Sequence, residues 1–175
     1  AGLVSLIKNG KIGNAKVGKG EWLVIEADES DGSIIQYKPE IGLLLNIEKD
    51  HKEIDVLLDV FNTFRNNSRK FIVNQSHPLA KKLSVDPGND FAIDTPGQAA
   101  MQATDFKQEG LNIQFRINGE PFELNLVGRH NMENTLAAVA VAVQLGISLK
   151  TCAAALKNYE GIYRRSQVLG SRNGT

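Results

Sequence analysis

The stretch Glu26–Ser33, EADESDGS, carries four carboxylates within its first six residues and directly follows the apolar run Trp22–Ile25, WLVI. An apolar run of this kind predicts a buried strand. The acids then lie at the carboxyl end of that strand, where open α/β sheets bind their ligands. Two uses of these acids are equally open. They bind a hard cation such as Mg²⁺ through oxygen, or they cap the next helix and form a solvated turn.

A second apolar run, Ile41–Leu45, also predicts a buried strand, and the polar residues Asn46–His51, NIEKDH, follow it. If the two strands are parallel neighbours, Glu26 and His51 emerge at the same edge of the sheet. A single histidine is more often a surface or structural residue than a metal ligand. A position just beyond a strand end, facing a carboxylate cluster, favours the ligand role.

The composition describes one soluble α/β domain. The chain has 175 residues, with 20 Lys and Arg against 20 Asp and Glu, so its net charge is zero. That balance argues against proteins that bind nucleic acid or a membrane surface, which usually carry a basic bias. There is no signal peptide and no membrane-spanning run. The single cysteine, Cys152, lies in an apolar helix pattern and is expected to be a buried core thiol, so a reducing, cytoplasmic setting fits.

Gly13–Gly20, GNAKVGKG, nearly matches the phosphate-binding pattern G-x-x-x-x-G-K-[ST]. Two features argue against that role. Gly20 replaces the Ser or Thr that would hold Mg²⁺, and the segment precedes a predicted strand, whereas a phosphate-binding loop follows a strand and opens a helix. A loop or hairpin is the better interpretation.

The next residues predict an alternation of strands and helices. Apolar residues from Glu53 to Phe64 fall at helical spacing, and Phe71–Val73 predicts a third short strand. His77, which precedes a proline, is expected to have a structural role at the start of a short helix that ends at Leu83. This rhythm predicts right-handed parallel crossovers, and therefore an α/β fold with a mostly parallel sheet flanked by helices.

The pattern changes in the second half of the chain. Leu111–Ile117 alternates apolar and polar residues, Asn118-Gly119 is a strong two-residue hairpin signal, and Phe122–Leu126 alternates again. A small antiparallel sheet is therefore predicted. Two alanine-rich helices are predicted to follow it, over Met132–Leu145 and Leu149–Asn158, and their alanines indicate close packing in the core.

Polar residues near the start of the first alanine-rich helix and near the end of the chain leave two readings open. Asn131 and Asn134 are either helix caps or amides that donate and accept hydrogen bonds at an adenine edge. The paired Arg164 and Arg165 are either a solvated rim or a guanidinium site for phosphate or acyl-phosphate oxygens.

Four motifs resemble the central domain of the Mur ligases, in the right order and over nearly the whole chain. They are Glu26–Ser33 (EADESDGS), Asn46–His51 (NIEKDH), Gly128–Ile147 (GRHNMENTLAAVAVAVQLGI) and Gly161–Gly170 (GIYRRSQVLG). The likeness is strongest to the branch that joins L-alanine to UDP-N-acetylmuramate, although the branch that adds a peptide to the same sugar shares much of it. In these ligases ATP phosphorylates a substrate carboxylate, and an amine then attacks the acyl phosphate.

The resemblance implies a role for several single residues in phosphoryl transfer. Glu26 falls on a Mg²⁺ ligand, and His51 falls on the ligand of a second Mg²⁺. Arg165 falls on the arginine that contacts the transferring phosphate, so Arg165 and His51 are the expected catalytic residues. Phosphoryl transfer needs mainly positioning and charge neutralisation, which these residue types supply.

The resemblance also implies two sets of binding residues. One set contacts the nucleotide-sugar substrate: Asp28, Glu29 and Ser30. The other binds the adenine and ribose of ATP: His130, Asn131 and Asn134.

By the same resemblance, residues 1–170 are expected to form part of a central, ATP-binding domain, and residues 171–175 to lead towards a carboxy-terminal domain. The family's phosphate-binding loop and both flanking domains are expected to lie outside this chain, so the chain alone is expected to be inactive as a ligase. The alternative is an α/β binding module without a catalytic role.

Overall fold

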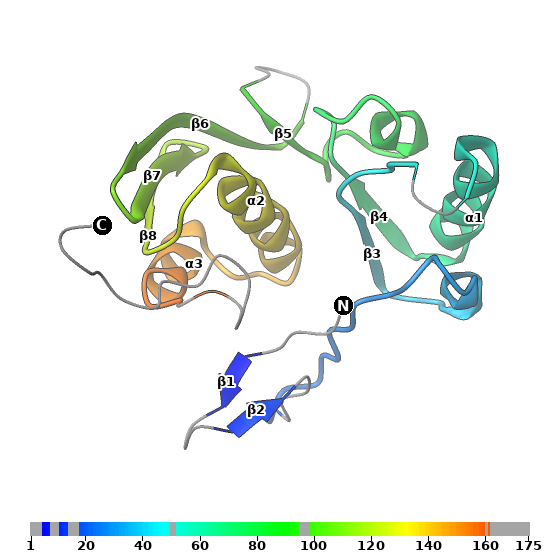
Figure 1. Ribbon diagram of the computed structural model, residues 1–175, viewed down its shortest axis with the longest axis horizontal. Helices are drawn as coiled ribbons and strands as arrows, with labels where there is room; N and C mark the ends of the chain where they lie inside the picture. The colour runs from blue at the N-terminus through cyan, green and yellow to red at the C-terminus, as the bar shows by residue number, and fades with distance from the viewer. Residues whose placement is uncertain are drawn as a thin grey trace, which may run out of the picture. The chain divides into compact units, whose positions relative to one another are not determined.

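The computed structural model describes residues 5–7, 11–13, 18–49, 52–94, 99–159 and 161. The chain divides into two compact units, residues 1–27 with 160–175, and residues 28–159. In the first unit, β1 (Ser5–Ile7) pairs with β2 (Lys11–Gly13) as an antiparallel hairpin, drawn in blue in Figure 1. No helix begins at Gly18–Gly20, which agrees with a loop or hairpin here and not a phosphate-binding loop.

Trp22–Ile25 does not form the buried strand that its composition predicts. These side chains are 51–86% exposed, and no β-ladder joins the segment to another strand of the described residues. An extended segment becomes a strand only where a neighbour takes up its N–H and C=O groups, and its side chains are buried only where another layer covers them. The prediction of a buried strand ending at Glu26 is therefore wrong.

The second unit begins with a short 3₁₀ helix, η1 (Ser33–Gln36), and then alternates strand, helix and strand. The alternating elements are β3 (Ile41–Leu44), α1 (Ile54–Asn67) and β4 (Lys70–Val73). β3 and β4 pair in parallel, from Ile41 opposite Lys70 to Leu44 opposite Val73. The predicted parallel crossover is confirmed.

Two helices cover opposite faces of the β3–β4 pair (Figure 1). On one face, Phe71 contacts Phe64 of α1 edge to face, with the ring centroids 5.9 Å apart. On the other face, Ile72 belongs to the core that includes α2 (Arg129–Gln144). Because successive side chains of a strand point to opposite faces, this packing explains why β4 reads as a continuous apolar run.

An isolated parallel bridge between Asn74 and Phe91 connects β4 to a second sheet. That sheet contains β5 (Phe91–Ile93), β6 (Met101–Glu109), β7 (Asn112–Ile117) and β8 (Glu120–Leu124), in this order. β5 pairs with β6 in parallel, whereas β7 pairs antiparallel with both β6 and β8. The predicted α/β class, with parallel strands flanked by helices and a small antiparallel part, is confirmed.

The turn between β7 and β8 is the one that the sequence predicts. Asn118 and Gly119 have φ angles of 46° and 86°, as a two-residue turn with positive φ at both positions requires. The inward-facing residues of β7, Ile113 and Phe115 among them, are buried. Leu111, expected on the same face, lies before the strand and is 55% exposed.

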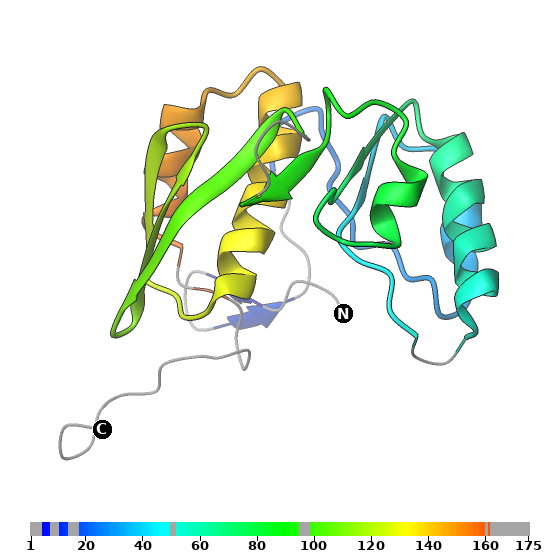
Figure 2. The same ribbon diagram turned by 90° about the horizontal axis from the view of Figure 1, so that it is seen from above.

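α2 lies between the β3–β4 pair and the second sheet, and α3 (Leu149–Leu156) packs beside it against β8 (Figures 1 and 2). α2 ends as predicted at Gly146, whose φ is 81°. The Gly146 N–H donates to Val143 O, and the Ile147 N–H donates to Ala142 O, the pair of bonds that closes a Schellman motif.

The second alanine-rich helix also matches its prediction. The Ser148 hydroxyl caps it by accepting a hydrogen bond from the Thr151 N–H at 3.2 Å. Cys152 is buried, and this burial raises the pKa of its thiol. A thiol that stays protonated is a poor nucleophile, so the expected core role fits.

The loop between β4 and β5 is organised by two polar side chains. His77 Nδ1 accepts the Ala80 N–H at 3.2 Å, at the start of the short 3₁₀ helix η2 (Ala80–Leu83), which confirms the structural role expected for His77. Asp90 has no exposed surface. Its carboxylate accepts hydrogen bonds from the Val73 N–H, the Gln75 amide and the Ser84 hydroxyl at 2.8, 2.6 and 2.5 Å, so it joins β4 to the loop.

Candidate functional site

The acidic stretch forms a series of tight turns in the structure. Asp28 Oδ1 accepts the Ser30 N–H, and Asp31 Oδ1 accepts the Ser33 N–H, each at 2.8 Å. Hydrogen bonds from the side chain and backbone of Ser30 lower the pKa of Asp28 below the ordinary value, and those from the backbone and side chain of Ser33 lower the pKa of Asp31. Asp28 and Asp31 therefore have the turn role that was one of the two predictions for this stretch.

A lysine connects the acidic stretch to the polar residues that follow β3. Lys52 Nζ donates to the backbone oxygen of Glu29 at 2.7 Å, across 23 residues of sequence. Glu29 therefore lies close to Lys52, which follows His51 in the sequence. The contact is made by the lysine side chain and a backbone carbonyl, and not by the predicted metal-binding side chains. Glu29 is half-buried, and Asp28 and Ser30 are exposed. These three residues, which are predicted to bind the substrate, lie in one turn.

The predicted metal and phosphate residues are not brought together by any observation in the structure. His51 and Arg165 lie outside the described residues. Glu26 is exposed and belongs to the first unit. Across the described part of the chain, no three His, Cys, Asp or Glu side chains gather as a metal-binding group. These assignments stay predictions.

The start of α2 is shaped by Gly128. Its φ is 88°, a conformation that glycine adopts readily. A Cβ added to Gly128 would lie 2.6 Å from the His130 ring, so the imidazole covers the space that only glycine leaves open. The Gly128 N–H donates to the Gln108 side chain of β6 at 2.9 Å. The helix therefore begins at a fixed point beside the second sheet.

The three predicted nucleotide residues have two different roles here. Asn131 is half-buried, and its Nδ2 donates to Val127 O at 2.8 Å, so its amide holds the helix start. His130 and Asn134 are exposed and lie four residues apart, which places them on one helix face. An imidazole and a carboxamide on one exposed face can together donate to and accept from the edge of a base.

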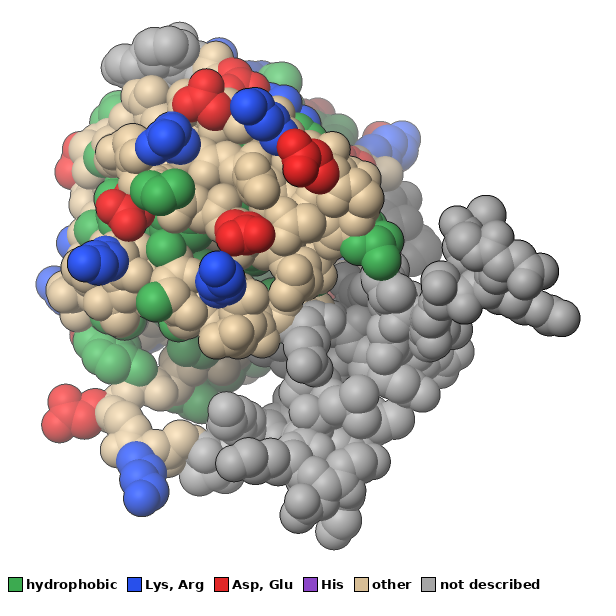
Figure 3. All heavy atoms as spheres, turned by 90° about the vertical axis from the view of Figure 1, so that its left-hand side faces the viewer, with side chains coloured by type: hydrophobic (Ala, Val, Ile, Leu, Met, Phe, Trp, Pro, Cys, Tyr) green, Lys and Arg blue, Asp and Glu red, His purple; other side chains and the backbone are tan. Residues whose placement is uncertain are grey.

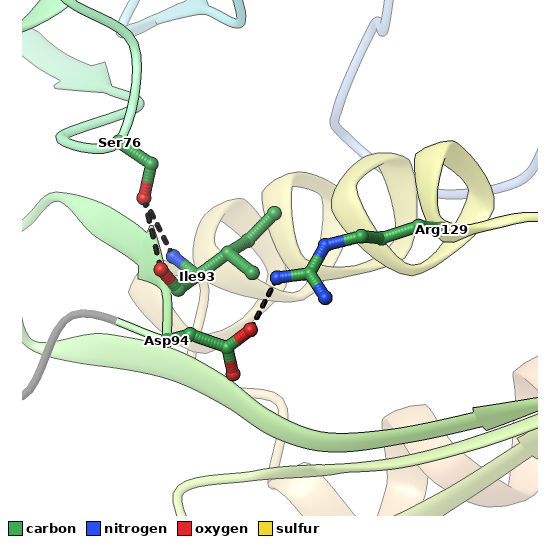
Figure 4. A network of polar contacts seen from close by, with 4 residues as sticks. All are labelled: Ser76, Ile93, Asp94 and Arg129. Carbon is green, nitrogen blue, oxygen red and sulfur yellow. Dashed lines mark hydrogen bonds and ion pairs between the residues drawn. The ribbon is translucent and has the colours of Figure 1, made fainter.

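Several polar contacts fix this helix start to the carboxyl ends of β4 and β5. Asn74 Nδ2 donates to Glu133 Oε1 at 2.6 Å. Arg129, the first residue of α2, forms an ion pair with Asp94, which follows β5. Figure 4 shows this pair beside Ser76, whose hydroxyl accepts the Ile93 N–H at 2.8 Å.

Sequence patterns did not predict these contacts. Asn74 directly follows the apolar residues of β4, and Glu133 lies in the polar start of α2. Neither position indicates its partner in the sequence.

Charged side chains are mixed on the face of the second sheet. Viewed from that side, the acidic and basic groups of the described residues are interspersed (Figure 3), and these residues form no basic patch of the kind that nucleic acid requires. None of the described helices is both long and apolar enough to cross a membrane.

Comparison with protein families places this chain beside a known domain family. The model of the Mur ligase middle domain matches residues 9–142. Among curated proteins, the UDP-N-acetylmuramate–L-alanine ligase of Gloeobacter violaceus is 34% identical, over 92% of this chain and 37% of its own length. The enzyme of the same name from Nostoc punctiforme is 32% identical, over 93% of this chain and 35% of its own length. The chain thus spans about a third of the length of these curated relatives.

Comparison with solved structures agrees on the fold. The UDP-N-acetylmuramate–alanine ligase of Thermotoga maritima superposes with a TM-score of 0.69 and is 18% identical, over 81% of this chain and 34% of its own length.

Proposed function

Because this chain belongs to the Mur ligase family, we propose that it is the central, nucleotide-binding part of an ATP-dependent ligase that joins L-alanine to UDP-N-acetylmuramate. The similarity to ligases of that name over 92% of the chain carries the proposal. The exposed His130 and Asn134 at the start of α2 support nucleotide binding, because they offer hydrogen bonds to a base from a fixed helix. We place the central domain over residues 1–170.

The proposed reaction has two steps. A carboxylate oxygen of UDP-N-acetylmuramate attacks the γ-phosphorus of ATP, which forms an acyl phosphate and releases ADP. The amine nitrogen of L-alanine then attacks the carbonyl carbon, the C–O bond to phosphate breaks, and the nitrogen loses a proton. Phosphate leaves with the electron pair of that bond, and an amide remains.

The proposed binding residues divide between the two substrates. His130 and Asn134 contact the adenine and ribose, and Asn131 keeps their helix turn in place through its bond to Val127 O. The turn Asp28–Ser30 lies on the side of the nucleotide sugar, where its exposed polar groups are available for hydrogen bonds.

Glu26 and His51 are the proposed Mg²⁺ ligands, and Arg165 is the proposed phosphate contact. One or two carboxylates suffice for Mg²⁺ in nucleotide sites because the ion keeps several waters and takes phosphate oxygens. An exposed carboxylate such as Glu26 suits that donor set. The bound ion would supply neutralisation of phosphate charge.

Binding of Mg²⁺·ATP to the whole ligase that contains this chain, followed by NMR on the backbone amides of α2, tests the nucleotide part of the proposal. Changes are expected first at the α2 start, and GTP should compete more weakly because its base presents a different edge. His130→Ala and Asn134→Ala should each weaken ATP binding by about two- to tenfold, the loss of one net hydrogen bond.

Asn66→Ala is the matched control, since Asn66 is also an exposed helical asparagine but lies on α1. It should leave binding unchanged. Absence of ATP binding, or equal effects of Asn66→Ala and Asn134→Ala, would contradict the assignment of α2 as the nucleotide site.

A further inference from the structure

α2 is tied to β4 near both of its ends. Near the start of α2, Glu133 accepts a hydrogen bond from the amide of Asn74, which follows β4 directly. At the end of α2, Gln144 accepts a hydrogen bond from the ammonium group of Lys70, the first residue of β4. Gln144 lies eleven positions after Glu133, about 16 Å of helix rise, and Asn74 lies four positions after Lys70, about 13 Å of extended chain. The two spans match, so α2 lies antiparallel along β4.

The contact at the start of α2 is the more enclosed one. Asn74 is only 1% exposed. Its Oδ1 accepts the Ser76 N–H at 2.9 Å while its Nδ2 donates to Glu133, so the two ends of the amide are each matched to a partner of the right kind. A buried amide that is fixed in this way gives Glu133 one preferred position.

The same helix face carries a second anchor. Arg129 and Glu133 are four residues apart and lie on one face, which points to the ends of β5 and β4. His130 and Asn134 repeat this spacing one residue later, and so lie about 100° around the helix. Because the first face is held, the direction of the second face is set.

We infer that Glu133 is a positioning residue: by holding Asn74, it fixes the rotation of the first turn of α2 and thereby aims His130 and Asn134 at the base. This inference rests on the proposed nucleotide site. Glu133 itself does not touch the nucleotide. The Asp94–Arg129 pair assists from β5 (Figure 4), but both of its side chains are about half exposed, where ion pairs contribute little.

The test compares Glu133→Ala, Glu133→Gln and Gln144→Ala in the whole ligase that contains this chain. Glu133→Gln keeps an oxygen that accepts from Asn74 and should bind Mg²⁺·ATP within roughly twofold of the unaltered protein. Glu133→Ala removes that oxygen and should weaken Mg²⁺·ATP binding by about tenfold. Gln144→Ala removes the contact at the far end of the same helix and is the matched control.

A second probe separates positioning from general damage. Inorganic tripolyphosphate lacks the base, so its affinity should change less than about twofold in Glu133→Ala. The melting temperature should fall at least as far in Glu133→Ala as in Gln144→Ala, because Glu133→Ala leaves the amide of the buried Asn74 without its acceptor. Only Glu133→Ala should lose ATP affinity.

The possible failures are distinguishable. If the unaltered protein does not bind ATP, the proposed function is overturned, and the inference with it. If it binds ATP and Glu133→Ala binds equally well, only the inference is overturned. Equal losses for ATP and tripolyphosphate, or for Glu133→Ala and Gln144→Ala, would show a structural role and would also overturn it.

Discussion

Removing the buried carboxylate of Asp90 should destabilise the second unit more than any exposed acid does. Asp90→Ala leaves the N–H of Val73 without an acceptor, and Val73 is fully buried. An unsatisfied buried donor costs about 1–3 kcal/mol. Gln75 and Ser84 are half-buried and can turn to water, so each loses only the roughly 0.5–1 kcal/mol of a net hydrogen bond. The expected loss is about 3 kcal/mol.

That loss is large beside the roughly 5–15 kcal/mol by which domains are usually stable. Asp90→Asn should cost less, about 1 kcal/mol, because its oxygen still accepts the Val73 N–H while its amide faces two donors. Urea unfolding followed by circular dichroism gives both values. The midpoint should move without a change in slope.

Asp86→Ala is the matched control for this measurement. Asp86 also accepts two hydrogen bonds, from the Gly88 N–H at 2.9 Å and the Asn89 amide at 2.6 Å, but it is exposed. Its loss should stay within roughly 0.5 kcal/mol. If Asp90→Ala costs no more than Asp86→Ala, the buried hydrogen bonds do not contribute as argued.

Two further predictions concern the acidic stretch. In a ligase assay of the full-length protein, Glu26→Gln should lower kcat by about 10²–10³-fold, as expected when one electrostatic contact to the transition state is lost, with little change in melting temperature; an early melt with normal turnover would make Glu26 a cap instead. The carboxyl groups of Asp28 and Asp31 should titrate by NMR below the ordinary value of about 3.9, since hydrogen bonds from Ser30 and Ser33 lower both pKa values. Their turns are then fully stabilised above about pH 4 and lose this contribution as the pH falls through the lowered values; midpoints at or above the ordinary value would refute it.

The sequence correctly predicted those helices and turns that depend on residues close together along the chain. The helical spacing in α1 places Leu57, Phe61 and Phe64 on its buried face, because helix periodicity and burial coincide when one face meets the core. The turn at Asn118 and the helix end at Gly146 were found because positive φ angles strongly favour these residue types.

Elements that depend on distant partners were predicted poorly. Strand β6 was not predicted, because a register shift between Thr104 and Lys107 interrupts the alternation of its side chains, and Asp105 has a φ of 59°. The strand prediction for Trp22–Ile25 was wrong for the opposite reason: the composition of this segment fits a strand, but no described strand pairs with it. Composition does not supply the partner that a strand needs.

In the candidate site too, contacts between residues close in sequence could be predicted, and contacts between distant residues could not. The turn role of Asp28 could be predicted because its partner is two residues away. The contact between Asn74 and Glu133 joins residues 59 positions apart, so only the fold reveals it. The family resemblance predicts that His130, Asn131 and Asn134 bind the nucleotide. The structure adds that the side chains of His130 and Asn134 are exposed, while Asn131 holds the helix start.

The alanines of α2 and the place of its exposed residues have one physical cause. A helix that lies between two sheets must bury more than one face, and small side chains let both sheets approach it closely. Leu136, Val139 and Ala140 are accordingly buried in the body of the helix. His130 and Asn134 lie near the start of the helix, where their side chains reach solvent. A binding residue near the end of such a buried helix is held in place by the packing of the helix, and no loop has to become ordered when the ligand binds. The geometry of the site is therefore set before the ligand arrives.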